Sequence, residues 1–210
     1  MKTTKIIAKT FSNKLLTMEG ISKRTVEEHL KLYQGYVNKY NEINEKLQTV
    51  NGDGLAKANQ VYSQFRELKV ELSFAWGGVV NHEIYFGHLG GKGGKPEGDL
   101  IRQIKTDFGS WDIYVKDLKA SAIAARGWVW TGWSKRENRL FNYLGDSQNT
   151  YAVWGVEPIL ALDTYEHAYF IDYGVNRVGY VVAFLDNLDW QVVENNFNCI
   201  KNCDCEKNSD

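Results

Sequence analysis

Two residues in the last third of the chain stand where their side chains could reach the same atom. Asp163 and His167 are four residues apart in the stretch "ALDTYEHAYF", where an apolar run gives way to a helix-like one. Residues i and i+4 of a helix share one face, so the carboxylate and the imidazole can point to one place. They form either a polar pair satisfied within the core or part of a metal site.

The other histidines bear on this choice. The chain has four in all: His29 on a first predicted helix, His82 late on a second, His167 at the start of a C-terminal helix, and His88. A single histidine on an apolar helix face is usually a core residue with a hydrogen bond. Three imidazoles and Asp163 on elements that pack together, however, make a mixed nitrogen and oxygen set. Such a set suits manganese, iron or zinc better than calcium or a thiolate-bound metal.

Aromatic residues are frequent around these positions. Each of them taken alone is explained by a well-packed core. Together they could wall a metal off from water and so influence its redox potential and its access. The residues concerned are Tyr33, Tyr36, Trp76, Tyr85, Phe86, Trp128, Trp130 and Tyr165.

Two long helices are expected to position the first two histidines. The first opens at Ser22, whose hydroxyl can cap it, and "NGDG" (51–54) breaks it. A second helical run extends from about Leu55 to Leu89, which predicts an antiparallel helical hairpin. The glycine-rich segment 90–100 then marks a boundary between two halves.

The second half mixes helices with short strands, which predicts an α+β fold. A small antiparallel sheet of about three strands should be flanked by helices. The predicted strands are 127–133, 139–145 and 156–165, and the predicted helices are 99–125 with an interruption at 107–110, 166–174 and 179–197. The expected divisions are a helical hairpin domain over 1–90, an α+β domain over 91–198 and a cysteine-containing polar tail over 199–210.

Composition limits the possible partners. The 210 residues carry a net charge of −1, so no global basic field favours nucleic acid or anionic lipid. No run approaches the ~18 apolar residues of a membrane span. The basic N-terminus lacks the apolar segment of a signal peptide. We therefore expect a cytoplasmic protein with neither nucleic acid nor a membrane as partner.

The three cysteines, Cys199, Cys203 and Cys205, all lie in the last twelve residues. A core disulfide is therefore impossible, which fits a reducing compartment. Their C-x3-C-x-C spacing matches no strong zinc motif, so we interpret them as incidental thiols in a polar tail rather than as a soft-metal site.

Several short stretches carry a resemblance to a known family. They occur in family order over roughly residues 15–197, and on them the chain resembles the iron/manganese superoxide dismutases. The matching stretches are "DTYEHAYF" for D-x-W-E-H-A-Y-Y, "NHEIYF" for N-H-x-x-F/Y-W, "GWVW" for G-W-x-W, "YVNKYN", "KGGKPEG", "TDFGSWDIYVKDL" and "VNRVGY".

The resemblance implies an activity and a set of ligands. The chain would disproportionate superoxide to dioxygen and hydrogen peroxide at one manganese or iron ion per subunit. Carried over position by position, the ligands would be His29, His82, Asp163 and His167. The opening pair, Asp163 and His167, would then be four residues apart because both bind one metal.

The resemblance also implies roles around the metal. Gln148 matches the glutamine that hydrogen-bonds the solvent at the metal in manganese-type members, whereas iron-type members usually supply it from the position of Gly78. This modestly favours manganese. Tyr36 matches the tyrosine at the substrate entrance. Arg177 matches an arginine near that entrance, where it would attract an anion.

Other residues would complete the surroundings and the subunit interface. Tyr33, Trp128 and Tyr165 would lie around the ligands, and Glu166 matches the glutamate that reaches the partner subunit's ligand histidine. The resemblance thus implies a homodimer, with a tetramer as the alternative. Phe170 would lie at the same interface.

The chain departs from the family pattern at this interface. Tyr165 replaces a tryptophan, Phe170 replaces a tyrosine, and the second histidine of H-x3-H on the first helix is absent. Because of these losses, the alternative function is that of a catalytically weak or silent metal-binding dimer of the same fold. A zinc hydrolase on the same ligands would need an adjacent general base, and none is found near the motifs.

The first ligand can be aligned in two ways. Alignment on "YVN" would place Glu28 at the metal, whereas alignment on "SKRTVEEH" places His29 there. We expect His29, because it shares one helical stripe with Tyr33, Tyr36 and Tyr40, and Glu28 lies about 100° away. The helix should then be regular α-helix, with Tyr33 stacked above His29 in place of the missing histidine.

Overall fold

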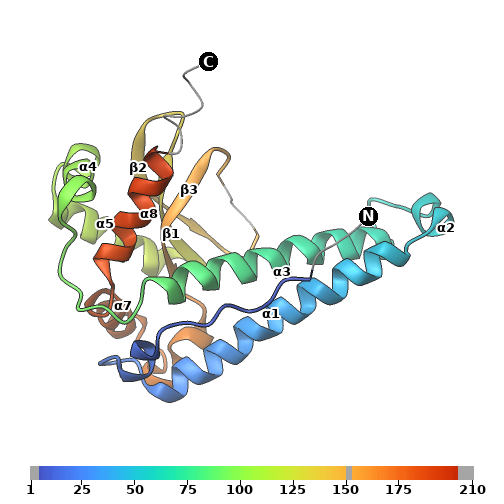
Figure 1. Ribbon diagram of the computed structural model, residues 1–210, viewed down its shortest axis with the longest axis horizontal. Helices are drawn as coiled ribbons and strands as arrows, with labels where there is room; N and C mark the ends of the chain where they lie inside the picture. Colours follow the sequence, from blue (N-terminus) through green and yellow to red (C-terminus); the bar gives the residue numbers. More distant parts are fainter. Residues whose placement is uncertain (1–4, 150–152, 203–210) are drawn as a thin grey trace.

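The computed structural model describes residues 5–149 and 153–202, and it shows a helical N-terminal half followed by a three-stranded sheet with helices around it (Figure 1). This confirms the expected α+β class. The helices of the first half are η1 (Asn13–Thr17), α1 (Lys23–Thr49), α2 (Gly52–Ala56) and α3 (Gln64–Gly87). Those of the second half are α4 (Gly98–Phe108), α5 (Trp111–Ala124), η2 (Glu166–Ala168), α6 (Phe170–Tyr173), α7 (Arg177–Asp186) and α8 (Trp190–Asn202). The strands are β1 (Trp128–Ser134), β2 (Arg139–Gly145) and β3 (Val156–Asp163).

Helices α1 and α3 form the long antiparallel pair that crosses the lower half of Figure 1, with α2 at its far end. The Ser22 hydroxyl accepts a hydrogen bond from the Thr25 N–H at 3.2 Å, so the expected cap is confirmed. The α-helical pattern of α1 is unbroken over its 27 residues. Both observations agree with a regular first helix.

The second helix begins later than expected. A helix starting near Leu55 and running to Leu89 was predicted, but the chain forms only the short α2 there and starts α3 at Gln64. The intervening residues hydrogen-bond locally instead: the Asn59 side chain accepts from the Val61 N–H at 2.8 Å, and Ser63 caps α3. Such side-chain-to-backbone bonds compete with helix formation.

The sheet places the third ligand-bearing segment beside the hairpin. Its order is β2-β1-β3, and both pairs of strands are antiparallel, as expected. Trp128 at the start of β1 pairs with Asp163 at the end of β3. This end of the sheet lies against the C-terminal half of α3, where Trp128 and Asp163 approach His82 (Figure 1).

The C-terminal helices are more divided than the sequence indicated. The segment 166–174 forms the short η2 and α6, and the predicted helix 179–197 is split between α7 and α8. Asp189 causes the second break, because its carboxylate accepts from the Gln191 N–H at 3.2 Å at the start of α8. Helix α8 continues to Asn202, so Cys199, which was expected in the polar tail, lies exposed on this helix. Cys203 and Cys205 lie outside the described residues.

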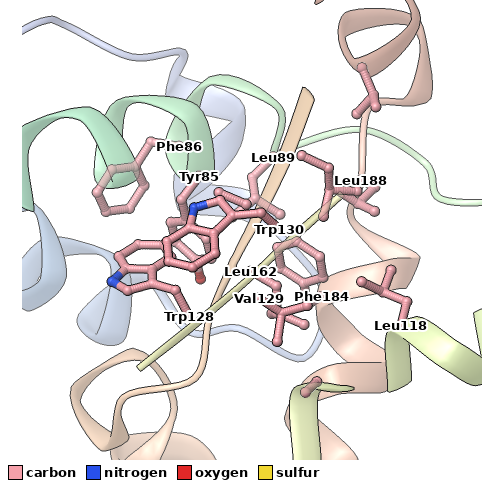
Figure 2. Close-up of a cluster of buried hydrophobic side chains, with 14 of the residues drawn as sticks. Tyr85, Phe86, Leu89, Leu118, Trp128, Val129, Trp130, Leu162, Phe184 and Leu188 are labelled. Atoms are coloured by element: carbon pink, nitrogen blue, oxygen red, sulfur yellow. The ribbon is translucent and has the colours of Figure 1, made fainter. Parts of the chain in front are cut away.

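The core joins the two halves. Figure 2 shows Tyr85 and Phe86 of α3 facing Trp128 and Trp130 of β1, with Phe184 of α7 on the other side. These side chains are almost fully buried. The end of α3 is therefore packed against the sheet by large aromatic surfaces, which fixes the elements that carry the histidines and Asp163. Within the described part of the chain, no helix combines the length and the apolar character needed to cross a membrane.

Candidate metal centre

Four residues that are far apart in the sequence meet at the junction of the hairpin and the sheet. The ligand atoms of His29, His82, Asp163 and His167 all lie within 4.8 Å of one another. The Oδ2 atom of Asp163 is 3.1 Å from the Nε2 atoms of both His29 and His167, and 3.6 Å from that of His82. Three imidazole nitrogens thus converge on one carboxylate oxygen.

The local structure of each element explains this convergence. His29 lies on the inward face of α1 and is 3% exposed, whereas Glu28 is exposed and pairs with Lys31 on the surface. Asp163 ends β3, and its Oδ1 accepts a hydrogen bond from the Tyr165 N–H at 2.9 Å. This bond turns the chain into η2, which brings His167 back over Asp163. The structure therefore places His29, and not Glu28, with the other three residues.

The tautomer of His82 directs a lone pair into the cluster. Its Nδ1 lies 2.6 Å from the carbonyl oxygen of Gly78, which can only accept, so Nδ1 carries the proton. Its Nε2 is fully buried and has no hydrogen-bond partner among the described residues. A buried, unpaired nitrogen aimed at two other imidazoles and a carboxylate fits a metal ion of the manganese, iron or zinc type.

The electrostatics of the cluster also suit a cation. Burial alone would raise the pKa of the Asp163 carboxyl, but the charge of His167 and hydrogen bonds from His167 and His29 hold this pKa well below its usual value. Burial lowers the pKa of His82 to about 3, with a further contribution from His29. For His167, burial is outweighed by the Asp163 carboxylate, which raises the pKa of His167, so metal binding here would have to displace a proton from His167, whereas His82 is already neutral.

Gln148 and Tyr36 form a hydrogen-bonded pair next to this cluster. The Gln148 Oε1 accepts from the indole N–H of Trp128 at 3.0 Å, and Gln148 Nε2 donates to the Tyr36 hydroxyl at 3.1 Å. An indole nitrogen can only donate, so this contact fixes which end of the amide is oxygen. The Tyr36 ring lies 5.3 Å from that of His82. The two residues predicted to act beside the metal are therefore adjacent to one of its candidate ligands.

Two glycines of α3 provide the space for this pair. A Cβ atom on Gly77 would lie 2.1 Å from the Gln148 carbonyl oxygen, and one on Gly78 would lie 2.5 Å from the Tyr36 ring. Both distances are too short for a real side chain. The absence of side chains at these positions is therefore required for Gln148 and Tyr36 to approach the cluster.

Most of the predicted aromatic residues surround the histidines. Tyr85 and Phe86 contact His29, at ring-centroid distances of 5.1 and 4.9 Å, and Trp128 lies 5.1 Å from His82. Tyr165 stacks on His167 at 5.3 Å. Trp76 was expected in this group, and that prediction is wrong. Its side chain is 46% exposed and packs on Tyr40, because it faces outward on α3.

Tyr33 is buried, but it does not stack above His29 as predicted. Its ring packs against Phe11 at 5.6 Å and lies 6.3 Å from the ring of His82. Its hydroxyl accepts from the Lys9 N–H at 2.9 Å and donates to Glu83 at 3.0 Å. The N-terminal segment and a carboxylate on α3 thus draw this side chain away from His29, and neither contact was foreseen from the helical stripe alone.

Three further predicted residues do not belong to the cluster. The Arg177 guanidinium donates to the Ala125 carbonyl at 2.7 Å and to the Tyr169 hydroxyl at 3.2 Å, so it is held at the end of α5. Glu166 and Phe170 are exposed in the single chain on either side of His167.

Sequence reasoning missed several residues that support the site. Asn81 donates to the Gln148 carbonyl at 3.1 Å and accepts from the Trp130 indole N–H at 3.3 Å. The Tyr180 hydroxyl donates to the Asp163 carbonyl at 2.9 Å. Asn81 precedes His82 in the "NH" motif, which is a signal that could have indicated it. Tyr180 offers no such signal, because its contact depends on how α7 packs.

Comparison with known proteins agrees with this arrangement. Residues 18–90 match the model of the alpha-hairpin domain of iron/manganese superoxide dismutases, and residues 96–196 match the model of the C-terminal domain of the same family. Together these matches cover nearly the whole described chain.

Individual relatives carry names of both metal types. The chain is 47% identical over 183 residues to "Superoxide dismutase [Fe]" of Aquifex aeolicus, covering 86% of this chain and 85% of the relative. It is 35% identical over 159 residues to "Superoxide dismutase [Mn] 2" of Haloferax volcanii, covering 75% and 77% of the two chains. With three histidines and an aspartate gathered at one point, and with both family domains matched in order, this chain belongs to the iron/manganese superoxide dismutase family.

Proposed function

We propose that this chain disproportionates superoxide at one iron or manganese ion held by His29, His82, Asp163 and His167. The observation that carries this proposal is the approach of three imidazole Nε2 atoms to a single Asp163 oxygen, at 3.1 to 3.6 Å. When bound, the metal supplies the redox chemistry: it takes an electron from one superoxide and gives it to the next. The reaction also consumes protons, which the protein must help to deliver.

The chain's own residues set the charge of this site. As ligands the three imidazoles would be neutral and Asp163 would supply one negative charge, which would offset part of the charge of the cation. The Tyr165 N–H and the Tyr180 hydroxyl each hold one end of the Asp163 residue in place. These contacts orient the carboxylate before any ion arrives, which is how surrounding hydrogen bonds tune a metal ligand.

Gln148 and Tyr36 are the residues that we propose for proton handling. Gln148 Nε2 donates one of its two hydrogens to the Tyr36 oxygen, which leaves the Tyr36 hydroxyl hydrogen free to be donated elsewhere. Burial raises the pKa of the Tyr36 hydroxyl, so it stays protonated at neutral pH. Tyr36 can therefore present a proton to a small oxygen species, and Gln148 keeps its hydroxyl oriented.

Access is proposed on the side of His167. The His167 side chain is 27% exposed, whereas those of His29, His82 and Asp163 are at most 2% exposed. A diatomic anion could approach past His167 and Tyr36 while the aromatic side chains exclude larger molecules. We propose that Arg177 attracts this anion. Its guanidinium keeps its positive charge among the carbonyl groups that it contacts.

The metal is proposed to be either ion, with a modest preference for manganese. Gln148 hydrogen-bonds the Tyr36 hydroxyl, and a Cβ atom at position 78 would lie 2.5 Å from the Tyr36 ring, so Gln148 and not residue 78 supplies the amide beside Tyr36. This is the arrangement that the resemblance associates with manganese. The names of the relatives from Aquifex aeolicus and Haloferax volcanii support both metals.

A homodimer in the cytoplasm is the assembly that we propose. Apolar side chains are exposed beside Glu166: those of Phe170 (50%), Val175 (91%) and Val178 (62%). Large exposed apolar side chains of this kind are typical of a contact between subunits. They follow His167, the most exposed residue of the cluster, within eleven residues of the chain, so a second copy bound there would also help to cover the site.

The alternative is a metal-binding dimer with little or no activity. The departures at Tyr165 and Phe170 favour it, because they alter the surroundings of His167. The hydrogen bonds of Gln148 and Tyr36 favour the enzyme, because a silent scaffold has no need of an oriented amide beside the metal.

A pair of neighbouring substitutions tests the ligand set. His29→Ala and Glu28→Ala should be purified in parallel, and the metal bound per chain should be measured by elemental analysis. We expect His29→Ala to lose most of its metal and Glu28→Ala to retain it. Equal metal content in the two variants would show that His29 is not a ligand.

A further inference from the structure

The fourth histidine, His88, is buried but lies outside the metal cluster. It follows α3 directly and is fully inaccessible to solvent. Its Nε2 lies 3.1 Å from the backbone nitrogen of Ala161. A backbone N–H can only donate, so Nε2 is the acceptor and the proton of the neutral ring is on Nδ1. Burial lowers the pKa of His88 to about 3, which keeps this acceptor available at neutral pH.

The bond closes an otherwise open edge of the sheet. In the order β2-β1-β3, strand β3 has a neighbour on one side only. The Ala161 N–H faces away from β1, and an unpaired N–H at a buried edge is unfavourable. The His88 ring supplies the acceptor that a further strand would otherwise provide.

This contact connects the two elements that carry His82 and Asp163. His88 lies six residues after His82, and Ala161 lies two residues before Asp163. The end of α3 is also anchored to the start of α8, because the His88 carbonyl accepts from the Asp189 N–H at 2.8 Å. The His88 ring is thus attached to a fixed point, and it can hold β3 in position.

We propose that His88 is a positioning residue for the metal centre: its Nε2 holds β3 against the end of α3 and so sets the position of Asp163 relative to His82. The proposal rests on the metal site proposed above. The Nε2 of His82 is 3.6 Å from the Asp163 Oδ2, the longest of the three separations from this oxygen. Metal–ligand distances tolerate only about 0.2 Å of variation, so a small movement of β3 would alter the coordination.

The unpaired atom of His88 supports this role over simple space filling. Its Nδ1 has no hydrogen-bond partner among the described residues. An apolar side chain would remove this unpaired donor but would leave the Ala161 N–H without an acceptor. The histidine therefore keeps the unsatisfied donor on its own ring and away from the strand that carries Asp163.

Two amide substitutions separate the hydrogen bond from the volume of the ring. The oxygen of a glutamine reaches about as far from the backbone as Nε2, whereas that of an asparagine reaches only as far as Nδ1. His88→Gln and His88→Asn should be loaded with manganese and, separately, with iron. Two properties should be measured well below the melting temperature: the visible absorption spectrum of the metal and the rate of metal release to a chelator.

We expect His88→Asn to shift the absorption maximum and to release metal about tenfold faster than wild type, as for other residues that orient metal ligands. His88→Gln should restore both properties. Leu118→Ala is the control, because Leu118 is a fully buried core residue on α5. It should lower the melting temperature without changing the spectrum.

A wild-type spectrum and release rate in His88→Asn would overturn the proposal. So would a shift of equal size in Leu118→Ala, which would reduce His88 to a contributor to general stability. If His88→Asn does not fold, replacement of Ala161 by lactic acid removes the same bond from the donor side, because it converts the amide to an ester, and the same criteria apply. Wild-type protein that binds neither metal would overturn the metal site and this proposal with it.

Discussion

The indole N–H of Trp128 donates to the Oε1 of Gln148 at 3.0 Å, and this one bond determines which way the Gln148 amide faces. With Oε1 held by the indole, Nε2 is left to donate to Tyr36. Strand β1 thereby controls a polar group that comes from the loop after β2. The hydrogen bond that the Tyr36 hydroxyl accepts thus depends, through Gln148, on the orientation set by Trp128.

Replacing Trp128 by Phe should therefore impair turnover without removing the metal. The Gln148 amide would lose its fixed orientation, and activity per bound ion should fall by about tenfold or more, as for other residues that orient a metal site. Steady-state superoxide assays, normalised to metal content, would measure this. Trp133→Phe is the control, because Trp133 is equally buried but packs on Phe197. Similar activity in the two variants would contradict the orienting role.

Gly78→Ala should be harmful although alanine favours helices. A Cβ atom at this position would lie 2.5 Å from the Tyr36 ring, so Tyr36 must move. Crowding of this kind typically costs about 1–3 kcal/mol, more than the ~1 kcal/mol that the helix propensity of alanine contributes. Denaturant unfolding and turnover would both report it.

Gly35→Ala on α1 is the same substitution at an open position, and we expect it to stabilise the fold. No atom lies within 4 Å of the added Cβ, so this variant should gain up to ~1 kcal/mol of unfolding free energy and keep full activity. Destabilisation of both variants to the same extent would show that the contact with Tyr36 is not the cause.

The surface around Glu166 should be needed for dimer formation. Phe170→Glu places a charge in the exposed apolar surface, which would have to be desolvated in the dimer, so we expect monomers in analytical ultracentrifugation. Val61→Glu is the matched control at the tip of the hairpin, where Val61 is 83% exposed. If Val61→Glu dissociates the protein and Phe170→Glu does not, the interface lies at the hairpin tip instead.

Arg177 should affect how fast the substrate arrives rather than how fast it reacts. We expect Arg177→Gln to lower kcat/KM at low salt and to weaken its dependence on ionic strength, because the Debye length shrinks to about 10 Å at 0.1 M. Arg102→Gln removes the same charge from α4 and should change neither. If the salt dependence of Arg177→Gln is unaltered, Arg177 does not attract the substrate, and its role is limited to its hydrogen bonds with the Ala125 carbonyl and the Tyr169 hydroxyl.

Local patterns predicted much of this fold. The hydroxyl of Ser22 caps α1, and the three β-type runs form the three strands, because these features depend on residues close in the sequence. The inward position of His29 could be predicted from the helical stripe. The convergence of His29, His82, Asp163 and His167 could not be derived from spacing alone, and the family resemblance was needed to expect it.

The failures have two physical causes: the helix boundaries depend on local side-chain bonds such as those of Asn59 and Ser63, whereas the residues of the site depend on tertiary packing. Tyr33 was expected above His29, but Lys9 and Glu83 bind its hydroxyl and draw it elsewhere. Trp76 faces solvent although its neighbours face the core. The sequence predicts no role for His88, because its bond to Ala161 exists only once β3 packs against the end of α3.

The cluster around Asp163 should support superoxide turnover. The most direct test is the rate of superoxide disproportionation per bound ion, measured on protein reconstituted with manganese and, separately, with iron. We predict turnover well above that of the free ion for at least one of the two metals, and loss of both bound metal and turnover in Asp163→Ala. Full metal occupancy with no activity above the free ion for either metal would contradict the account and leave a silent metal-binding relative.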